Sequence, residues 1–210
     1  MATTASPYGL VPVKNADGSP YCGARDAFLI DPAGVAQNIG FGSVVILKDG
    51  YVQLSVKTGN ANDTNNFGAA ANSGAIGVFV GCEYVNAQGQ LVFDQHYPTG
   101  TAAPTGTSIV AYVVTDPGVT FQAQADATVA QAFLGRNTFF PANPNATTSI
   151  NTSTGKSTMA VDADAIDATG GLKIVGFSDR GESAVGDTYT DLLVKFNAAY
   201  HAFAAGDVAS

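Results

Sequence analysis

The sequence predicts an all-β protein, an antiparallel sandwich or barrel of jelly-roll-like type with one short helix and long loops. Short runs rich in valine, isoleucine, phenylalanine and tyrosine recur along the chain, and clusters of glycine, asparagine, aspartate and proline separate them. Only one segment carries helix signals, so helices do not alternate with strands as in an α/β protein. No internal repeat has a fixed period, which argues against solenoids and propellers.

The clearest local signal is a hairpin. Residues 43–48 and 51–57 are β-rich runs separated by Asp49-Gly50. This pair suits a type I′ turn, because both central positions of such a turn need a positive φ.

The remaining strands follow from similar patterns. A second hairpin is predicted from two β-rich runs joined by a short polar turn. In residues 119–125, apolar side chains alternate with Thr120, Gln122 and Gln124, the period of two that a half-buried strand requires. The other predicted strands are 76–85 and 90–98, which form that second hairpin, and then 108–114, 157–161, 171–177 and 190–197.

Residues 126–135 are predicted to form the one short helix. Asp126 can cap a helix N-terminus, and Val129 and Phe133 are four residues apart, on one helical face. Gly135 stands where a glycine commonly follows a helix.

Three regions are expected along the chain. Residues 1–26 contain several prolines and glycines and are predicted to form an extended N-terminal arm with at most a short strand. Residues 27–203 form a single β domain, and residues 204–210 a flexible tail. Within the domain, residues 58–74 and 136–156 are polar and are predicted to be loops.

Composition restricts the function. The chain has 210 residues and a net charge of −8, and only 12% of its residues are charged, compared with about 25% in a typical globular protein. An acidic chain is a poor match for nucleic-acid phosphates, and no apolar run is long enough for a transmembrane helix. The first residues lack the basic and apolar regions of a signal peptide, so we expect the protein to mature in a cytoplasm.

Two motifs resemble ligand sites. Residues 152–158 contain the Gly-Lys-Ser ending of a phosphate-binding loop, but position 150 is Ile where that loop needs glycine, and a strand is predicted where it needs a helix. Asp162, Asp164 and Asp167 could hold a hard cation, or they could form a solvated acidic loop, which we favour because the calcium-loop template is not met. No metal or other cofactor is expected.

The nucleophiles and bases give no catalytic constellation. Cys22 and Cys82 could pair in an oxidising compartment, but both are interpreted as buried packing thiols. A Cys82–His96 pair is conceivable, although an apolar strand would raise the pKa of the thiol and make it inert. His96 and His201 alone are too few for a catalytic metal site. The sequence therefore predicts a protein that is not an enzyme.

Four segments together resemble a family of tailed-bacteriophage virion proteins, the capsid cement or decoration proteins. They are SPYGLVPV near the start, IGVFVGCEYV followed by VFDQHYPTGT, AYVVTDPGVTFQAQAD before the expected helix, and SAVGDTYTDLLVKFNAAYH near the end. The resemblance extends from about Ser6 to His201. Its motifs are structural, and no catalytic or binding residue carries over.

The resemblance implies a protein that binds the outer surface of a capsid, contacts the major capsid protein and stabilises contacts between capsomers, often as a homotrimer. It would be made in host cytoplasm and located in the virion, without nucleic-acid or membrane partners. The alternative is a receptor- or glycan-binding module of a head fibre or tail, for which Tyr84, Phe93 and Tyr97 could supply exposed aromatic rings. Cross-strand packing in the core explains these three residues equally well.

The N-terminal arm supplies the candidate interface. It carries too many apolar side chains to remain in water, and an extended arm could add a strand to a neighbouring subunit or to the shell. Alternatively, the arm packs on its own domain. The candidate interface residues are Tyr8, Leu10, Val11, Val13 and Tyr21.

Overall fold

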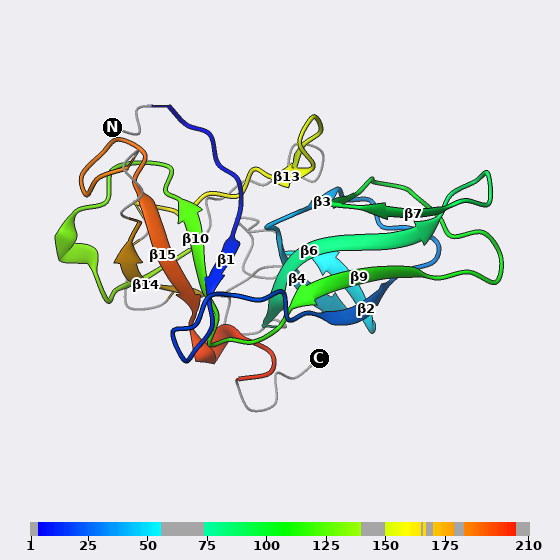
Figure 1. Ribbon diagram of the computed structural model, residues 1–210, viewed down its shortest axis with the longest axis horizontal. Helices are drawn as coiled ribbons and strands as arrows, with labels where there is room; N and C mark the ends of the chain where they lie inside the picture. Colours follow the sequence, from blue (N-terminus) through cyan, green and yellow to red (C-terminus); the bar gives the residue numbers. More distant parts are fainter. Residues whose placement is uncertain are drawn as a thin grey trace.

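A computed structural model describes residues 4–55, 74–139, 150–164, 166, 170–178 and 183–204. Within these residues the protein is all-β, and its two large antiparallel sheets lie side by side in Figure 1. The predicted fold class is confirmed as a sandwich-like arrangement, and the described strands form no closed barrel. No helix among the described residues is long and apolar enough to cross a membrane.

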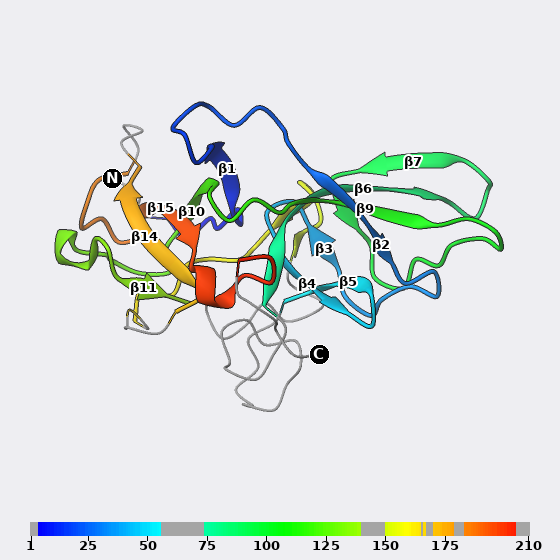
Figure 2. The ribbon, with the colours of Figure 1, turned by 90° about the horizontal axis from the view of Figure 1, so that it is seen from below.

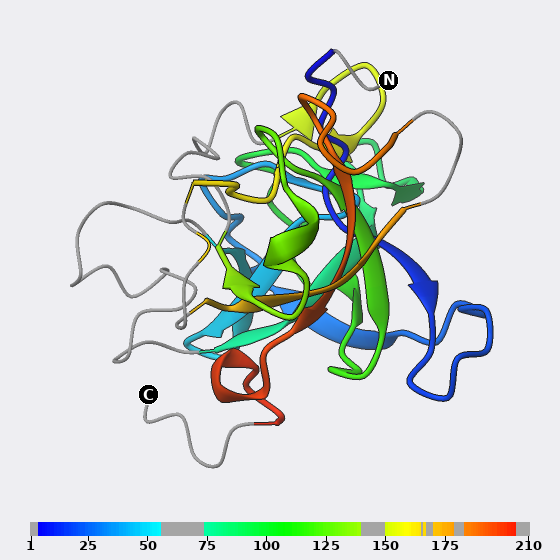
Figure 3. The same cartoon turned by 90° about the vertical axis from the view of Figure 1, so that its left-hand side faces the viewer.

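The first sheet combines strands from distant parts of the chain. Figure 3 shows β10, β15 and β14 side by side, with β1 at the edge. In spatial order the strands are β1 (Val11–Lys14), β10 (Thr120–Gln124), β15 (Asp191–Phe196), β14 (Leu172–Phe177) and β11 (Asn137–Thr138).

The second sheet is built around one long, curved strand, β6 (Ala75–Val85). On one side, β6 pairs first with β4 and then, near its C-terminal end, with β7; on the other side it pairs with β9. Figure 2 shows β7, β6, β9 and β2 adjacent to one another. The other strands are β2 (Asp26–Ile30), β9 (Ile109–Val114), β4 (Val44–Lys48), β5 (Tyr51–Leu54) and β7 (Leu91–Asp94).

Short elements complete the described fold. Two small strand pairs and two 3-10 turns lie between the large sheets or at their ends. They are β3 (Ile39–Gly40) with β8 (His96–Tyr97), β12 (Ile150–Asn151) with β13 (Lys156–Ser157), and the turns η1 (Gln131–Phe133) and η2 (Ala198–Tyr200).

Both predicted hairpins are confirmed. Lys48 pairs with Tyr51 across the Asp49-Gly50 turn, and both turn residues have positive φ, 51° and 82°. The second hairpin joins β6 to β7, with Val85 paired to Leu91. Of the run predicted at 157–161, only its first residue lies in a strand, the short β13.

The predicted helix over residues 126–135 is wrong. Only Gln131–Phe133 form a helical turn, and it is a 3-10 turn without a side-chain cap. The Asp126 carboxylate instead accepts the backbone N–H of Ala163 at 2.8 Å. Asp126 therefore makes a hydrogen bond to a residue distant in sequence and does not cap a helix. Gly135 does adopt the positive φ, 85°, expected of a glycine after a helical turn.

Strand β10 is covered on both faces, although its alternating pattern predicted one exposed face. Phe121 and Ala123 are fully buried, as the pattern requires. Thr120 and Gln124 are also buried, and the Gln124 side chain accepts the backbone N–H of Ser6 at 2.7 Å. The segment before β1 thus covers the polar face of β10.

A single cluster of buried apolar side chains includes residues from both large sheets. Leu10, just before β1, belongs to it and is fully buried. The backbone N–H groups of Gly9 and Leu10 donate to the carbonyls of Met159 and Gly42. Residues 9–14 therefore form part of the folded core of their own chain.

Candidate functional site

The expected interface residues of the N-terminal arm pack on their own chain, the second of the two alternatives for this segment. Leu10 is buried in the core, and Val11 and Val13 are half-buried within β1. The Tyr8 hydroxyl donates to Asp191 at 3.0 Å. The Tyr21 hydroxyl donates to the carbonyl of Ala24, and burial raises its pKa. The role of these residues at an interface stays a prediction.

Of the three aromatic residues suggested for glycan binding, only Phe93 is exposed. Tyr84 and Tyr97 are buried in the core, which selects cross-strand packing over exposed rings for these two residues. The Tyr97 hydroxyl is occupied inside the fold, because it accepts the N–H of Val35 and donates to the carbonyl of Thr101.

In the Gly-Lys-Ser segment, Gly155 ends the turn between β12 and β13, and Lys156 and Ser157 form β13, so a strand stands where a phosphate-binding loop needs a helix. The backbone N–H groups of Thr154 and Gly155 donate to the Asn151 carbonyl, and that of Ser153 donates to the Asn151 side chain. Because these N–H groups point into the turn, they do not form the cradle that a phosphate-binding loop needs.

The acidic segment also makes internal hydrogen bonds. The Asp162 carboxylate accepts the backbone N–H of Asp164 at 3.0 Å, and Asp167 lies outside the described residues. Asp126 lies nearby, and burial, followed by the charges of Asp162 and Asp164, raises its pKa. Among the described residues no group of three or more potential ligands could hold a metal ion.

The two cysteines differ. Cys22 is exposed, which corrects its interpretation as a buried packing thiol, whereas Cys82 is buried as expected. Burial, followed by the charge of Asp94, raises the pKa of the Cys82 thiol to about 12. Cys82 contacts the His96 carbonyl, while the His96 ring lies 3.0 Å from Asp94, so these residues do not form a thiolate–imidazole pair.

The outer face of β2, β9, β6 and β7 carries three of the exposed large apolar side chains of the described structure. Pairing places Leu29, Val110, Glu83 and Phe93 in one row across the four strands. Leu29 is 46% exposed and Phe93 68% exposed, and Leu91, on the same face of β7, is 59% exposed. We call this row together with Leu91 the apolar face.

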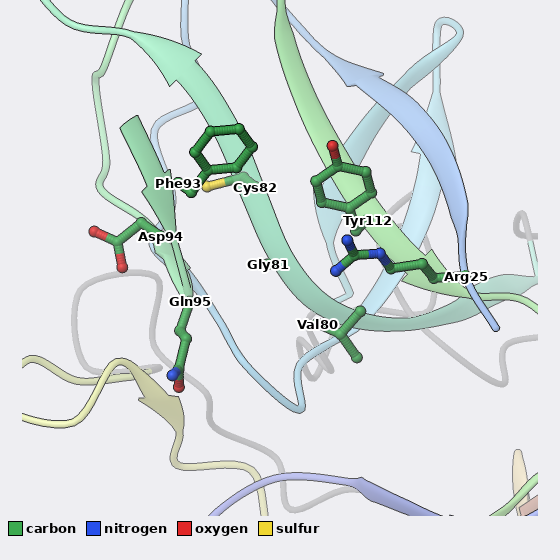
Figure 4. A pocket seen from close by; sticks show the side chains of 8 residues that line it. All are labelled: Arg25, Val80, Gly81, Cys82, Phe93, Asp94, Gln95 and Tyr112. Carbon is green, nitrogen blue, oxygen red and sulfur yellow. The ribbon is translucent and has the colours of Figure 1, made fainter. Parts of the chain in front are cut away.

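A hollow interrupts this surface where β6 bulges at Gly81 (Figure 4). It has a volume of about 240 Å³. Phe93 and Gln95 line one side and Tyr112 and Arg25 the other, with Val80 and Gly81 between them. Because Gly81 has no side chain, the space between the two sides stays open.

Arg25 is held in place by an aromatic ring. Its guanidinium carbon lies 4.1 Å from the centre of the Tyr112 ring, a cation–π contact. The Tyr112 hydroxyl donates to Glu83 at 2.8 Å, and this hydrogen bond is the main cause of the raised pKa of Tyr112. Among the described residues no carboxylate forms an ion pair with Arg25.

A second hollow of about 360 Å³ adjoins the first. It lies between β7 and the β12–β13 turn, and it shares Phe93, Asp94 and Gln95 with the first hollow. Its other lining residues are His96 and the turn residues Thr152, Ser153, Thr154 and Gly155.

Comparison with known proteins identifies no relative of this chain. No family model, curated protein or solved structure matches the chain. In its described residues the chain is an antiparallel β protein, and the outer face of β2 and β7 exposes large apolar side chains. Of the residues on this face and around its hollow, only Phe93 was expected from the sequence, because the positions of Arg25, Leu29 and Tyr112 depend on strand register.

Proposed function

We propose that the chain is a structural protein of a tailed-bacteriophage virion, which binds the outer surface of the capsid and stabilises contacts between capsomers. The observation that carries this proposal is the apolar face. Large exposed apolar surfaces on soluble proteins commonly mark interaction sites. The resemblance of the four sequence segments to capsid cement proteins names the partner, the major capsid protein.

The exposed side chains of the apolar face and the unpaired edge of β7 favour a protein partner. Burying a large apolar side chain completely contributes about 1.5–3 kcal/mol, so Leu29, Leu91 and Phe93 together could support a stable contact. Among the described residues, no further strand pairs with the outer edge of β7. A partner could therefore also form backbone hydrogen bonds along that edge.

The charges of the face agree with an interface. Interface cores are depleted in Lys, Glu and Asp. Glu83 is the one acidic residue in the row, and Tyr112 already satisfies part of its hydrogen bonding. The net charge of −8 suits an outer capsid surface, whereas a surface facing packaged DNA would be favoured by Lys and Arg.

We test the proposal by capsid binding. The double substitution Leu29→Ser with Leu91→Ser should lower the affinity for capsids lacking this protein at least about tenfold, a loss of about 1.4 kcal/mol. Leu134→Ser is the matched control, because Leu134 is 45% exposed but lies outside the apolar face. Co-sedimentation with capsids measures both. Equal binding by all the variants would contradict the proposal.

The copy number separates this function from the alternative, a receptor- or glycan-binding module of a head fibre or tail. A cement protein should occur in many copies per virion and a receptor-binding module in few, which gel densitometry of purified particles measures. We also propose that the protein is a homotrimer on the capsid. Light scattering that finds only monomers, together with isolated copies on the particle, would contradict the trimer.

A further inference from the structure

We propose that the two adjoining hollows beside β7 bind a saccharide that carries a carboxylate, such as a uronic acid. Phe93 belongs both to the apolar face and to these hollows. The inference is nevertheless separable from capsid docking, because Arg25, Tyr112, Gln95 and the β12–β13 turn lie outside the apolar face. The first argument is the shape of the surface. The hollows share Phe93, Asp94 and Gln95, so they lie next to each other along β7, and a ligand of several sugar units could reach both.

The carboxylate is assigned to Arg25. Stacking on Tyr112 fixes the guanidinium at the wall of the first hollow, and Figure 4 shows it directed toward the space between the two walls. No described carboxylate pairs with Arg25. A planar guanidinium with unoccupied N–H groups binds a carboxylate in a bidentate manner, and stacking in advance reduces the entropy lost on binding.

The sugar ring is assigned to Phe93. Its ring is 68% exposed and lies across the hollow from Arg25. Aromatic side chains present a large rigid surface that the apolar C–H face of a sugar can cover. A ligand with only a carboxylate would make no use of the Phe93 ring on the opposite side of the hollow.

The hydroxyl groups of the ligand are assigned to the polar residues along the groove. Asp94 and Gln95 are shared by both hollows, and the second hollow adds Thr152, Ser153 and Thr154. Asp94 is held in place because its Oδ1 atom accepts the backbone N–H of His96 at 3.2 Å and lies 3.0 Å from the His96 ring. Carboxylate, amide and hydroxyl side chains together offer both the donors and the acceptors that a polyhydroxylated ligand requires.

The glycine at the floor makes the site possible. A Cβ atom at Gly81 would lie 3.1 Å from the Asp94 carbonyl oxygen, and it would project from the strand that separates the two walls. The bulge and the missing side chain together keep the first hollow open.

The experiment is an NMR titration of the isotopically labelled full-length protein. The probes are the trisaccharide of galacturonic acid, the neutral trisaccharide of galactose, and a tri-aspartate peptide. We expect the acidic saccharide to bind with a Kd below about 10 mM and the neutral one at least about tenfold more weakly. The shifted amides should lie in residues 80–82, 93–96 and 152–155.

Matched variants test the assigned roles. Arg25→Gln should weaken binding of the acidic trisaccharide at least about tenfold, and Arg25→Lys should restore only part of it. The control Arg136→Gln removes the same charge from an exposed arginine near another ring, that of Phe133, and should leave the Kd unchanged. Phe93→Ala should also weaken binding about tenfold, whereas Leu91→Ala on the same strand should not.

Several outcomes would overturn the inference. They are no binding of the acidic saccharide up to about 10 mM, equal affinity for the neutral trisaccharide, equal losses for Arg25→Gln and Arg136→Gln, or binding of the peptide but not the saccharide. Capsid binding by the Arg25→Gln variant should be normal, and saccharide binding by the Leu29→Ser variant should be normal. Failure of this inference is therefore distinguishable from failure of the proposed capsid function.

Discussion

The two large sheets differ in what covers their faces. In the first sheet, β10 is buried on both faces, including the polar residues Thr120 and Gln124. In the second sheet, the outer face of β7 exposes Leu91 and Phe93 although half-buried Val92 packs against the core. Both sheets contribute to the core, but β10 is covered by its own chain, whereas Leu91 and Phe93 of the second sheet remain available for contacts outside the chain.

Removing the N-terminal segment should have the largest effect on this difference. Deleting residues 1–20 removes β1 and Leu10 and exposes an edge and a face of β10. We expect the truncated chain to lose cooperative unfolding in urea, measured by circular dichroism. Deleting only residues 1–4 is the control and should leave the unfolding midpoint unchanged. A 1–20 deletion that unfolds at the original urea concentration would show that this segment is not part of the core.

Two matched phenylalanine substitutions compare the sheets directly. Phe121 is fully buried and contacts Phe196 edge-on, with ring centres 5.5 Å apart. Phe121→Ala should therefore lower the free energy of unfolding by about 3–5 kcal/mol. Phe93→Ala should change it by no more than about 0.5 kcal/mol, as expected for an exposed position. Similar losses measured for both variants in urea would mean that the apolar face supports the fold.

Acid should weaken the junction between the sheets. His201 is fully buried, its backbone bridges to Ala75 of β6, and its ring packs on Phe196 of β15. Burial lowers the pKa of His201 from the ordinary value of 6.5, and its Nε2 atom has no hydrogen-bond partner in the described part of the chain. The unfolded chain thus binds a proton more readily, so His201 contributes stability above about pH 6.5 that is lost as the pH falls below it.

Urea unfolding at several pH values measures this effect. The His201→Phe variant should lose less stability between about pH 7 and pH 5 than the unaltered protein. The His96→Gln variant is the control and should keep the full acid-dependent loss. An identical pH dependence for His201→Phe and the unaltered protein would exclude His201 as the cause.

A smaller loss of stability is expected from substitutions in the β4–β5 hairpin turn of the second sheet. Gly50 has a φ of 82°, so Gly50→Ala should lower the free energy of unfolding by about 1–2 kcal/mol. Gly50→Asn should cost less, because asparagine tolerates the left-handed region better than alanine. Thermal unfolding measures both variants. A smaller loss for alanine than for asparagine would mean that backbone conformation does not determine the cost at this turn.

Local chemistry made part of the fold predictable. Asp49-Gly50 identified its hairpin because the φ requirements of a two-residue turn involve only neighbouring residues. The helix at 126–135 failed because Asp126 bonds to Ala163, a partner that no local pattern indicates. Competition of this kind between a local cap and a tertiary hydrogen bond is decided only in the folded chain.

The candidate site was less predictable, because it depends on register. Phe93 was named, but so were Tyr84 and Tyr97, since aromatic residues in strands look alike until the pairing is known. Tyr84 pairs with Val92 and Phe93 with Glu83, which places the two rings on opposite faces. Arg25 meets Tyr112 only because β2 pairs with β9, and this pairing joins segments that are distant in sequence.

The strand order of the two sheets also implies an order of events during synthesis. Most of the second sheet, from β4 to β9, comes from one continuous stretch of chain. The first sheet instead pairs β1 with β10 and β10 with β15, which are distant in sequence. Pairings between distant segments form slowly, because the entropy cost of closing the loop comes before the contacts that stabilise the pairing. We expect the second sheet to form first, while the chain is still on the ribosome. Strand β1 should remain unpaired until β10 has emerged, and the first sheet should be completed only after β15 has emerged.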